Sequence, residues 1–238
     1  MAIALLTDFG TRDPYVAAMK GVIASRTDAA IVDLTHEVAP FDVFEAAWFL
    51  RSVAKYWPAE TIFVCVVDPG VGTARRIIAV QSERRVFLAP DNGLLTFIRA
   101  DLIYSIENKS LFLSEGSSTF HGRDRFAPVA AAIANGLPLE EVGPRIDAMM
   151  MLELQPGMVV AIDRFGNVIT DITPRREAFA LQIGERVVDR METNYGDAAA
   201  GLFMIVGSTG CIEVSMKNAS AAEELRAVRG QRVRVRPL

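Results

Sequence analysis

Two fully apolar segments constrain the fold of this chain most strongly. Residues 2–7 form one of them, and residues 61–67, with the sequence TIFVCVV, form the other. Strands that lack polar alternation are typical of sheets that are buried on both faces. The second segment is also rich in β-branched and aromatic residues, which favours a central strand. Both segments therefore predict the interior strands of an α/β domain.

Helical patterns separate these strands. Apolar residues recur at three- and four-residue spacing from Pro14 to about Arg26. A second helix is expected from Asp42 to about Tyr56, with Asp42 as its N-cap and Glu45 completing a variant of the capping box. We also expect strands at residues 30–34, 77–80 and 86–89, a short helix at 91–98 and a longer helix at 123–135. This alternation predicts a largely parallel or mixed sheet.

The pattern changes after about residue 150. Short strand candidates are then divided by turn residues, and they lie at residues 158–163, 168–172, 178–182, 186–188, 203–206, 211–216 and 232–236. The only helical turns are near residues 221–225, so a small β-barrel or sandwich is indicated. We expect a Rossmann-like α/β domain over residues 1–152 and a small β-barrel domain over residues 157–238.

Composition argues against several classes of protein. The chain has 25 Lys and Arg against 29 Asp and Glu, and a general binder of nucleic acid or anionic membranes would need a basic excess. No apolar run reaches the ~18–20 residues of a membrane helix, and the N-terminus lacks a cationic signal-peptide region. We expect a cytoplasmic protein. Two Cys and two His argue against an all-N/S zinc site, so free thiols and no metal or cofactor are expected.

Polar residues gather where predicted strands end, which is where open α/β sheets place their ligand sites. Asp8 follows the first strand, and its carboxylate could accept both hydroxyls of a ribose or merely cap a turn. Asp68 follows the third strand in D-P-G-V-G-T-A-R-R, a loop whose glycines allow close backbone approach to a ligand. Arg75 could fold back onto Asp68, either within a site or as a salt bridge that staples the loop.

His121 lies in T-F-H-G-R-D just before a predicted helix. A lone histidine is more often structural than catalytic. Arg123 and Asp124 in the same loop favour a functional role, but the motif leaves both interpretations open.

A turn in the second half, within I-D-R-F-G-N-V-I-T, carries Asp163, Phe165 and Asn167. Phe165 could stack on a planar base, and Asn167 has the paired donor and acceptor needed to read the edge of that base. A hairpin turn with a packed phenylalanine is the alternative. The sequence Ser208-Thr209-Gly210 indicates a plain turn unless a ligand contacts it.

Six motifs occur in order over nearly the whole chain. They are L-L-T-D-F-G, L-T-H-E-V-A-P-F-D, V-D-P-G-V-G-T-A-R-R, A-P-D-N-G-L-L-T, T-F-H-G-R-D-R-F-A-P and D-R-F-G-N-V-I-T. Together they resemble the S-adenosyl-L-methionine hydrolase (adenosine-forming) family, also called SAM hydroxide adenosyltransferases, which is related to the fluorinase and chlorinase. Any one motif would be weak, whereas the ordered set is highly specific.

The resemblance implies a fold, an assembly and a reaction. Family members join an N-terminal α/β domain to a C-terminal β-barrel and form homotrimers, with the substrate between the N-domain of one subunit and the C-domain of its neighbour. The implied reaction is in-line attack of activated water or hydroxide on the ribose C5′ of S-adenosyl-L-methionine, giving adenosine and L-methionine. The catalytic set of the family maps onto Asp68, Arg75 and His121.

The resemblance also implies substrate-binding residues. These are Asp8 for the ribose, Phe41 for the aromatic wall beside it, Asp163 and Ser208 for the methionine moiety, and Phe165, Asn167 and Ala219 for the adenine side. The chain departs from the family pattern at three positions. Cys211 replaces an aromatic residue, Lys217 an Asn, and Ala219 a Gly.

These residue types suit the implied reaction. A sulfonium leaves as a neutral thioether, so the difficulty lies in the nucleophile. Either His121 or Asp68 would deprotonate the water, while Arg75 orients Asp68 and stabilises developing hydroxide.

Two other functions stay open at this point. Halide-dependent adenosyl transfer is disfavoured, because the fluorinase has Tyr where Asp68 stands and Ser where Gly122 stands, and an ionised Asp68 would repel a halide. A non-catalytic sensor of S-adenosylmethionine or adenosine would keep the nucleoside contacts but has no use for a water-activating set.

Overall fold

The computed structural model describes all 238 residues and divides into two compact units, Met1–Leu152 and Glu153–Leu238. Each unit has its own hydrophobic core.

A six-stranded mixed sheet forms the centre of the first unit, with the order β2-β1-β3-β5-β4-β6. The strands are β1 (Ala2–Thr7), β2 (Ala30–Thr35), β3 (Ile62–Val66), β4 (Ile77–Ser82), β5 (Arg85–Pro90) and β6 (Leu102–Ser105). The first four in this order are parallel neighbours, and β4 runs antiparallel to both β5 and β6. The predicted α/β domain with a mixed sheet is therefore confirmed.

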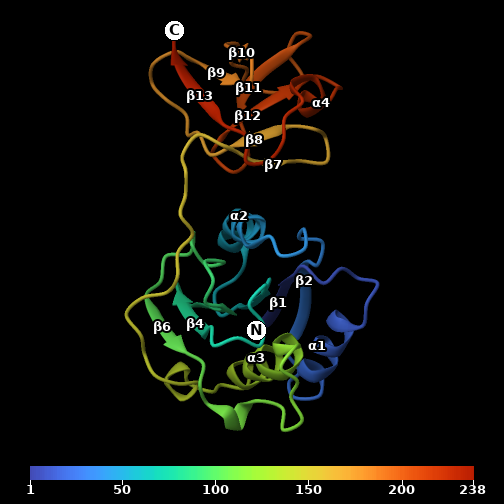
Figure 1. Cartoon of the computed structure of the whole chain (residues 1–238), viewed down its shortest axis with the longest axis vertical. Helices are drawn as coiled ribbons and strands as arrows, with labels where there is room; N and C mark the ends of the chain where they lie inside the picture. Colours follow the sequence, from blue (N-terminus) through green and yellow to red (C-terminus); the bar gives the residue numbers. More distant parts are fainter. The chain divides into compact units, whose positions relative to one another are not determined.

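Helices cover both faces of this sheet (Figure 1). They are α1 (Tyr15–Ala24), α2 (Val43–Val53) and α3 (Ala127–Ala134). The face with α1 and α3 buries Ile62 and Val64 of β3, whereas the face with α2 buries Phe63 and Cys65. Every residue of β3 is buried, which is why this strand has an uninterrupted apolar sequence.

The strands β1 and β3 are neighbours in the sheet, although β2 lies between them in the sequence. Thr7 pairs with Val66, so the two parallel strands end at the same edge. α1 connects β1 to β2 over one face, and α2 connects β2 to β3 over the other. The chain thus adds β2 on one side of β1 and then β3 on the other side, which makes the position between β1 and β3 a switch point of the strand order. Open α/β sheets bind ligands beyond such switch points.

The helix after Asp42 follows its predicted cap. The Asp42 side chain accepts a hydrogen bond from the backbone N–H of Glu45 at 2.8 Å. The Glu45 carboxylate reaches back to the N–H of Ala39 at 3.0 Å, so it binds the entering loop. A short 3-10 helix at Ala54–Tyr56 continues α2 to the predicted end.

Two other helix predictions need correction. Residues 91–98 form turns instead of a helix, because Gly93 has a φ of +94° and Thr96 and Ile98 bond to carbonyls three residues back. The helix predicted at 123–135 begins with a wider π turn at Gly122–Phe126 before α3.

The second unit consists of two antiparallel sheets, with the orders β10-β9-β13 and β11-β12-β8-β7. Its elements are β7 (Val159–Ile162), β8 (Val168–Thr170), β9 (Phe179–Ile183), β10 (Arg186–Val188), β11 (Leu202–Val206), β12 (Ile212–Met216), β13 (Val233–Pro237) and α4 (Ala221–Leu225). Hydrogen bonds from Val159 to Gln231 and from Val233 to Gly157 connect β7 with β13. Both sheets enclose one core, so the predicted small barrel is found as two joined sheets.

Cys65 and Cys211 are buried free thiols, as predicted. None of the helices combines the length and the apolar character needed to cross a membrane.

Candidate active site

A cavity of about 450 Å³ opens in the first unit beside the end of β3. Its lining includes Asp8, Phe41, Asp68 and His121. Asp8 follows β1, Asp68 follows β3, Phe41 precedes α2, and His121 precedes the π turn. Four of the residues singled out in the sequence therefore meet at the switch point of the sheet.

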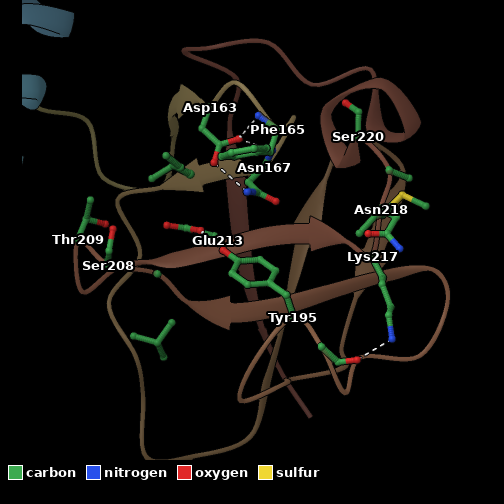
Figure 2. Close-up of a pocket in the computed structure, with 16 residues that line it drawn as sticks. Asp163, Phe165, Asn167, Tyr195, Ser208, Thr209, Glu213, Lys217, Asn218 and Ser220 are labelled. Atoms are coloured by element: carbon green, nitrogen blue, oxygen red, sulfur yellow. Dashed lines mark hydrogen bonds between the residues drawn. The ribbon is translucent and has the colours of Figure 1, made fainter.

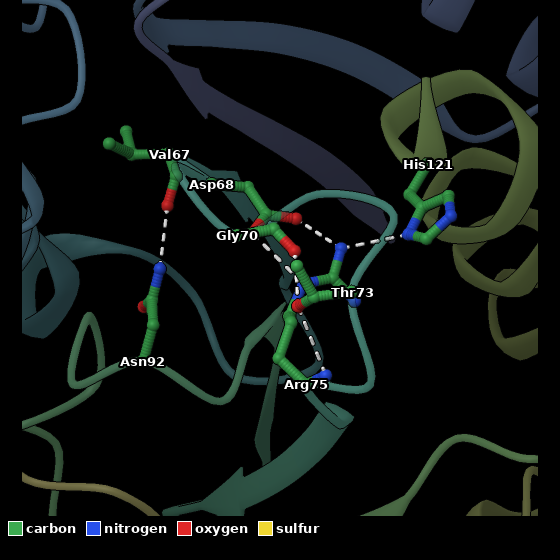
Figure 3. A network of polar contacts seen from close by, with 7 residues as sticks. All are labelled: Val67, Asp68, Gly70, Thr73, Arg75, Asn92 and His121. Atoms are coloured by element: carbon green, nitrogen blue, oxygen red, sulfur yellow. Dashed lines mark hydrogen bonds and ion pairs between the residues drawn. The ribbon is translucent and has the colours of Figure 1, made fainter. Parts of the chain in front are cut away.

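Arg75 connects Asp68 to His121 (Figure 3). Its Nε donates to Oδ1 of Asp68 at 2.9 Å, and its Nη2 donates to Oδ2, so the pair is bidentate. The same Nη2 lies 2.8 Å from Nδ1 of His121. The Asp68 and Arg75 side chains are only 5% and 10% exposed. The three side chains of the predicted catalytic set thus form one connected group.

This contact fixes the protonation of His121. A guanidinium has donors only, so Nδ1 of the ring must accept from Arg75. Burial, helped by the positive charges of Arg125 and Arg75, lowers the pKa of His121 to about 4. The ring is therefore neutral near pH 7 and carries its proton on Nε2. That nitrogen is buried, has no protein partner, and points away from Arg75 (Figure 3).

The loop between Asp68 and Arg75 requires glycine at position 72. Gly72 has a φ of +80°, and a Cβ there would lie 2.6 Å from the carbonyl oxygen of Ser118. Only glycine tolerates both conditions. The loop is thereby packed against the segment that leads to His121. The Asp68–Arg75 salt bridge also connects the two ends of this loop. The pair can therefore stabilise the loop and take part in a functional site at the same time.

Asp124 stabilises the segment that leads from Ser117 to His121. It is 1% exposed, and its carboxylate accepts from the N–H of Ser117 at 2.6 Å and from Nε of Arg123 at 2.5 Å. The two charged residues that accompany His121 in the sequence therefore bind each other and the loop.

Asp8 and Phe41 are joined directly. Oδ2 of Asp8 accepts from the backbone N–H of Phe41 at 2.9 Å. Phe41 has a φ of +69° and is 72% exposed. A non-glycine residue in this conformation costs on the order of 1–3 kcal/mol, and the bond to Asp8 offsets part of that cost. An exposed ring beside a carboxylate is compatible with the ribose contacts expected from the sequence, which stay a prediction.

A larger cavity of about 960 Å³ lies within the second unit (Figure 2). All the residues predicted for this unit line it, namely Asp163, Phe165, Asn167, Ser208 and Ala219. The structure therefore brings these five residues together around one space.

Asp163 organises the turn at this cavity. Its Oδ1 accepts from the N–H groups of Phe165 and Asn167 at 2.9 Å each, and its Oδ2 accepts from Nδ2 of Asn167 at 2.8 Å. Phe165 is 78% exposed, so the alternative of a packed phenylalanine is wrong. The hairpin is real, and it presents an exposed ring to the cavity.

Two residues that line this cavity were not identified from the sequence. The hydroxyl of Tyr195 donates to Oε2 of Glu213 at 3.0 Å (Figure 2). Burial raises the pKa of Glu213, and burial together with Glu213 raises the pKa of Tyr195 to about 12. The sequence did offer one signal for Glu213, because it is a charged residue within an otherwise largely apolar strand.

Two of the departures from the family pattern line the same cavity. Lys217 donates from Nζ to the carbonyl of Gly196 at 2.5 Å, and Ala219 forms a backbone bridge with Met216. Cys211 is buried. No group of three or more His, Cys, Asp or Glu side chains is arranged to hold a metal ion.

The two units correspond to two known domains. Residues 3–143 match the SAM hydroxide adenosyltransferase N-terminal domain, and residues 157–234 match the C-terminal domain. The chain therefore combines both domains of one class of two-domain proteins. The chain belongs to the SAM hydroxide adenosyltransferase family.

Several relatives are similar over nearly the whole chain. The (R)-S-adenosyl-L-methionine hydrolase of Thermus thermophilus is 37% identical over 98% of both chains. That of Salinispora tropica is 36% identical over 98% of this chain and 97% of the relative. The fluorinase of Actinopolyspora mzabensis is 29% identical over 71% of each. A crystal structure of an uncharacterized conserved protein from Thermotoga maritima has a TM-score of 0.91 and 35% identity, covering 98% and 99% of the two chains.

Proposed function

We propose that this protein hydrolyses (R)-S-adenosyl-L-methionine to adenosine and L-methionine. The names of the Thermus and Salinispora relatives support the substrate and the reaction. The observation that carries the proposal is the connected group of Asp68, Arg75 and His121 beside a cavity of the first unit.

The reaction needs a positioned and activated water molecule. Its oxygen attacks the ribose C5′, a C–O bond forms, and the C–S bond breaks with its electron pair passing to sulfur. The thioether leaves neutral, so no acid is required. One proton of the water must be lost, and hydroxide is scarce at pH 7. Alignment of the water with the C–S bond can contribute on the order of 7 kcal/mol.

The geometry favours different roles for the three side chains. The Nδ1 lone pair of His121 is taken by Arg75, so this nitrogen is not free to act as the base, and the ring helps to hold the guanidinium in place. Asp68 retains lone pairs beyond those used by Arg75 and is the remaining proton acceptor. Arg75 contacts Asp68 and His121 and so fixes their positions relative to each other. General-base help of this kind typically contributes ~10²–10⁴-fold in rate.

Halide is a poorer nucleophile for this cavity than water. The Asp68 carboxylate lines the cavity and would repel an anion. A Cβ at Gly122 would lie 3.0 Å from the sulfur of Met19 and 3.1 Å from the ring of Phe120, so there is little room for a side chain with a hydroxyl.

We propose a division of labour between the units. Residues 1–152 activate water and hold the ribose with Asp8 and Phe41, whereas residues 157–238 hold the remainder of the substrate. The second set comprises Phe165, Asn167 and Ala219 for adenine, and Asp163 and Ser208 for methionine. We further propose a homotrimer with active sites at subunit interfaces, which light scattering would test. The cytoplasmic location also stays a prediction.

The function is tested by incubating the purified protein with each sulfonium epimer in halide-free buffer. We expect adenosine and L-methionine in equal amounts from the (R) epimer. Product that forms only when halide is added would contradict hydrolysis, and binding without turnover over hours would favour a sensor.

A further inference from the structure

The motif A-P-D-N-G-L-L-T, at residues 89–96, is the only one of the six ordered motifs that contributes no residue to either cavity. Its first two residues end β5, and Asp91 and Asn92 follow directly. β5 lies between β3 and β4 in the sheet, parallel to the first and antiparallel to the second. The end of β5 therefore lies at the same edge as the end of β3 and the start of β4. These are the two ends of the loop that carries Asp68 and Arg75.

Asn92 binds the start of this loop (Figure 3). Its Nδ2 donates to the carbonyl oxygen of Val67 at 2.9 Å, and its Oδ1 accepts from the N–H of Leu94 at 3.2 Å. A carbonyl only accepts and an N–H only donates, so the two partners fix the orientation of the amide. The Val67 carbonyl belongs to the peptide that precedes Asp68, and Val67 is fully buried. The bond therefore fixes the backbone from which the Asp68 carboxylate projects.

Asp91 binds the other end of the loop. Its backbone N–H donates to the carbonyl of Arg76 at 3.0 Å, and its Oδ2 accepts from Nε and Nη2 of Arg76 at 2.9 and 2.6 Å. Its Oδ1 accepts from the N–H of Met150 at 2.6 Å, so both oxygens of this buried carboxylate are used. Arg76 directly follows Arg75. Two consecutive residues after β5 thus hold both ends of the segment that forms the Asp68–Arg75 pair.

We propose that Asn92 and Asp91 are positioning residues for hydrolysis, which keep the Asp68 carboxylate at the cavity and in its pairing with Arg75. This inference rests on the proposed function. Neither residue lines the cavity, so both act through the loop and not on the substrate. A misplacement of about 1 Å can lower a rate by about 10²-fold, and reacting groups need rigid support to avoid it. The effect falls on kcat and not on KM, because other residues hold the substrate.

Asn92→Asp removes the donor and keeps the side-chain shape and the acceptor oxygen. The matched control is Asn108→Asp: Nδ2 of Asn108 donates to the carbonyl of Glu141 at 2.8 Å, and its Oδ1 accepts from the N–H of Ser110 at 3.1 Å, outside both cavities. Both variants lose the same kind of bond, so both should lower the urea midpoint of unfolding. Only Asn92→Asp should lower kcat for adenosine release, by about ten- to hundredfold, with KM changed by less than about twofold.

A second measurement does not require turnover. Nε–H of Arg75 donates to Asp68, so its signal in proton–nitrogen correlation NMR reports on this pair. We expect Asn92→Asp to shift that signal and Asn108→Asp to leave it in place. Equal loss of kcat in the two variants, a raised KM with unchanged kcat, or an unmoved Arg75 signal in Asn92→Asp would overturn the inference.

If Asn92→Asp does not fold, Arg76→Met decides, because it removes a half-exposed guanidinium that binds the other end of the loop to Asp91. We expect kcat to fall by about threefold or more, and unchanged kcat would overturn the inference. A shifted Arg75 signal in Asn92→Asp, with no adenosine from the wild type, would contradict the proposed function alone. Adenosine release that Asn92→Asp leaves at the wild-type kcat would contradict this inference alone.

Discussion

Nη2 of Arg75 lies 2.8 Å from Nδ1 of His121, and the same nitrogen donates to the carboxylate of Asp68. One guanidinium thus joins groups that follow different elements of the sheet unit. It fixes the tautomer of the imidazole and the orientation of the carboxylate together. We therefore expect the three side chains to act as a unit.

Arg75→Lys tests this coupling. Lysine keeps the positive charge but lacks the planar fork that contacts both partners. We expect the rate of adenosine formation to fall by about 10²-fold or more. The double variant Arg75→Lys/His121→Gln should be little slower than the slower single variant, because groups that act as a unit are non-additive. Fully multiplicative losses in kcat would contradict the coupling.

Acidification should destabilise the protein through His121. Its folded-state pKa of about 4 lies below the ordinary value of about 6.5, so the unfolded chain binds more protons between these pH values. The free energy of unfolding should therefore rise with pH through this window, by up to about 1.4 kcal/mol per pH unit, and be lost as pH falls. Urea unfolding from about pH 4 to 7 should show a shallower dependence for His121→Gln than for the wild type. Identical slopes would exclude this contribution.

Gly72→Ala should distort the loop that carries the catalytic set. The positive φ and the 2.6 Å approach to Ser118 together predict a loss of about 1–3 kcal/mol in the free energy of unfolding, with lower turnover. Gly70→Ala is the matched control, since a Cβ there meets no atom closer than 3.5 Å. Comparable losses from both substitutions would show that the loop adapts to either side chain.

The exposed rings of Phe41 and Phe165 should contribute to binding and not to folding. Replacement of either by alanine should change the free energy of unfolding by no more than about 0.5 kcal/mol. Loss of a ring stacked on the nucleoside should raise KM by about tenfold. Tyr56→Ala, at a 71% exposed aromatic residue that lines neither cavity, should leave KM unchanged. An unchanged KM for both phenylalanine variants would remove these rings from the substrate site.

The sequence predicts those features that depend on local pattern. The apolar run at β3 indicated a buried strand, and Asp42 indicated a helix start that its hydrogen bond to Glu45 confirms. The turns around Gly93 were missed, because apolar spacing does not reveal a positive φ. Strand register cannot be read from one strand, so the cross-strand neighbours of Glu213 were not predictable.

The candidate site shows the same difference between features that a local sequence pattern predicts and features that depend on contacts between distant segments. Motifs located Asp68, Arg75 and His121 individually. The tautomer of His121 depends on its contact with Arg75, which lies 46 residues away in the sequence. No local pattern encodes that tautomer, because it arises only when the two loops meet.

The isotope content of the product tests the central claim most directly. The wild-type protein is incubated with (R)-S-adenosyl-L-methionine in oxygen-18 water, and the products are analysed by mass spectrometry. Direct displacement predicts one heavy oxygen in the 5′-hydroxyl of adenosine and none in L-methionine. Adenosine without the label, in a reaction that proceeds at the normal rate, would contradict attack by water at C5′.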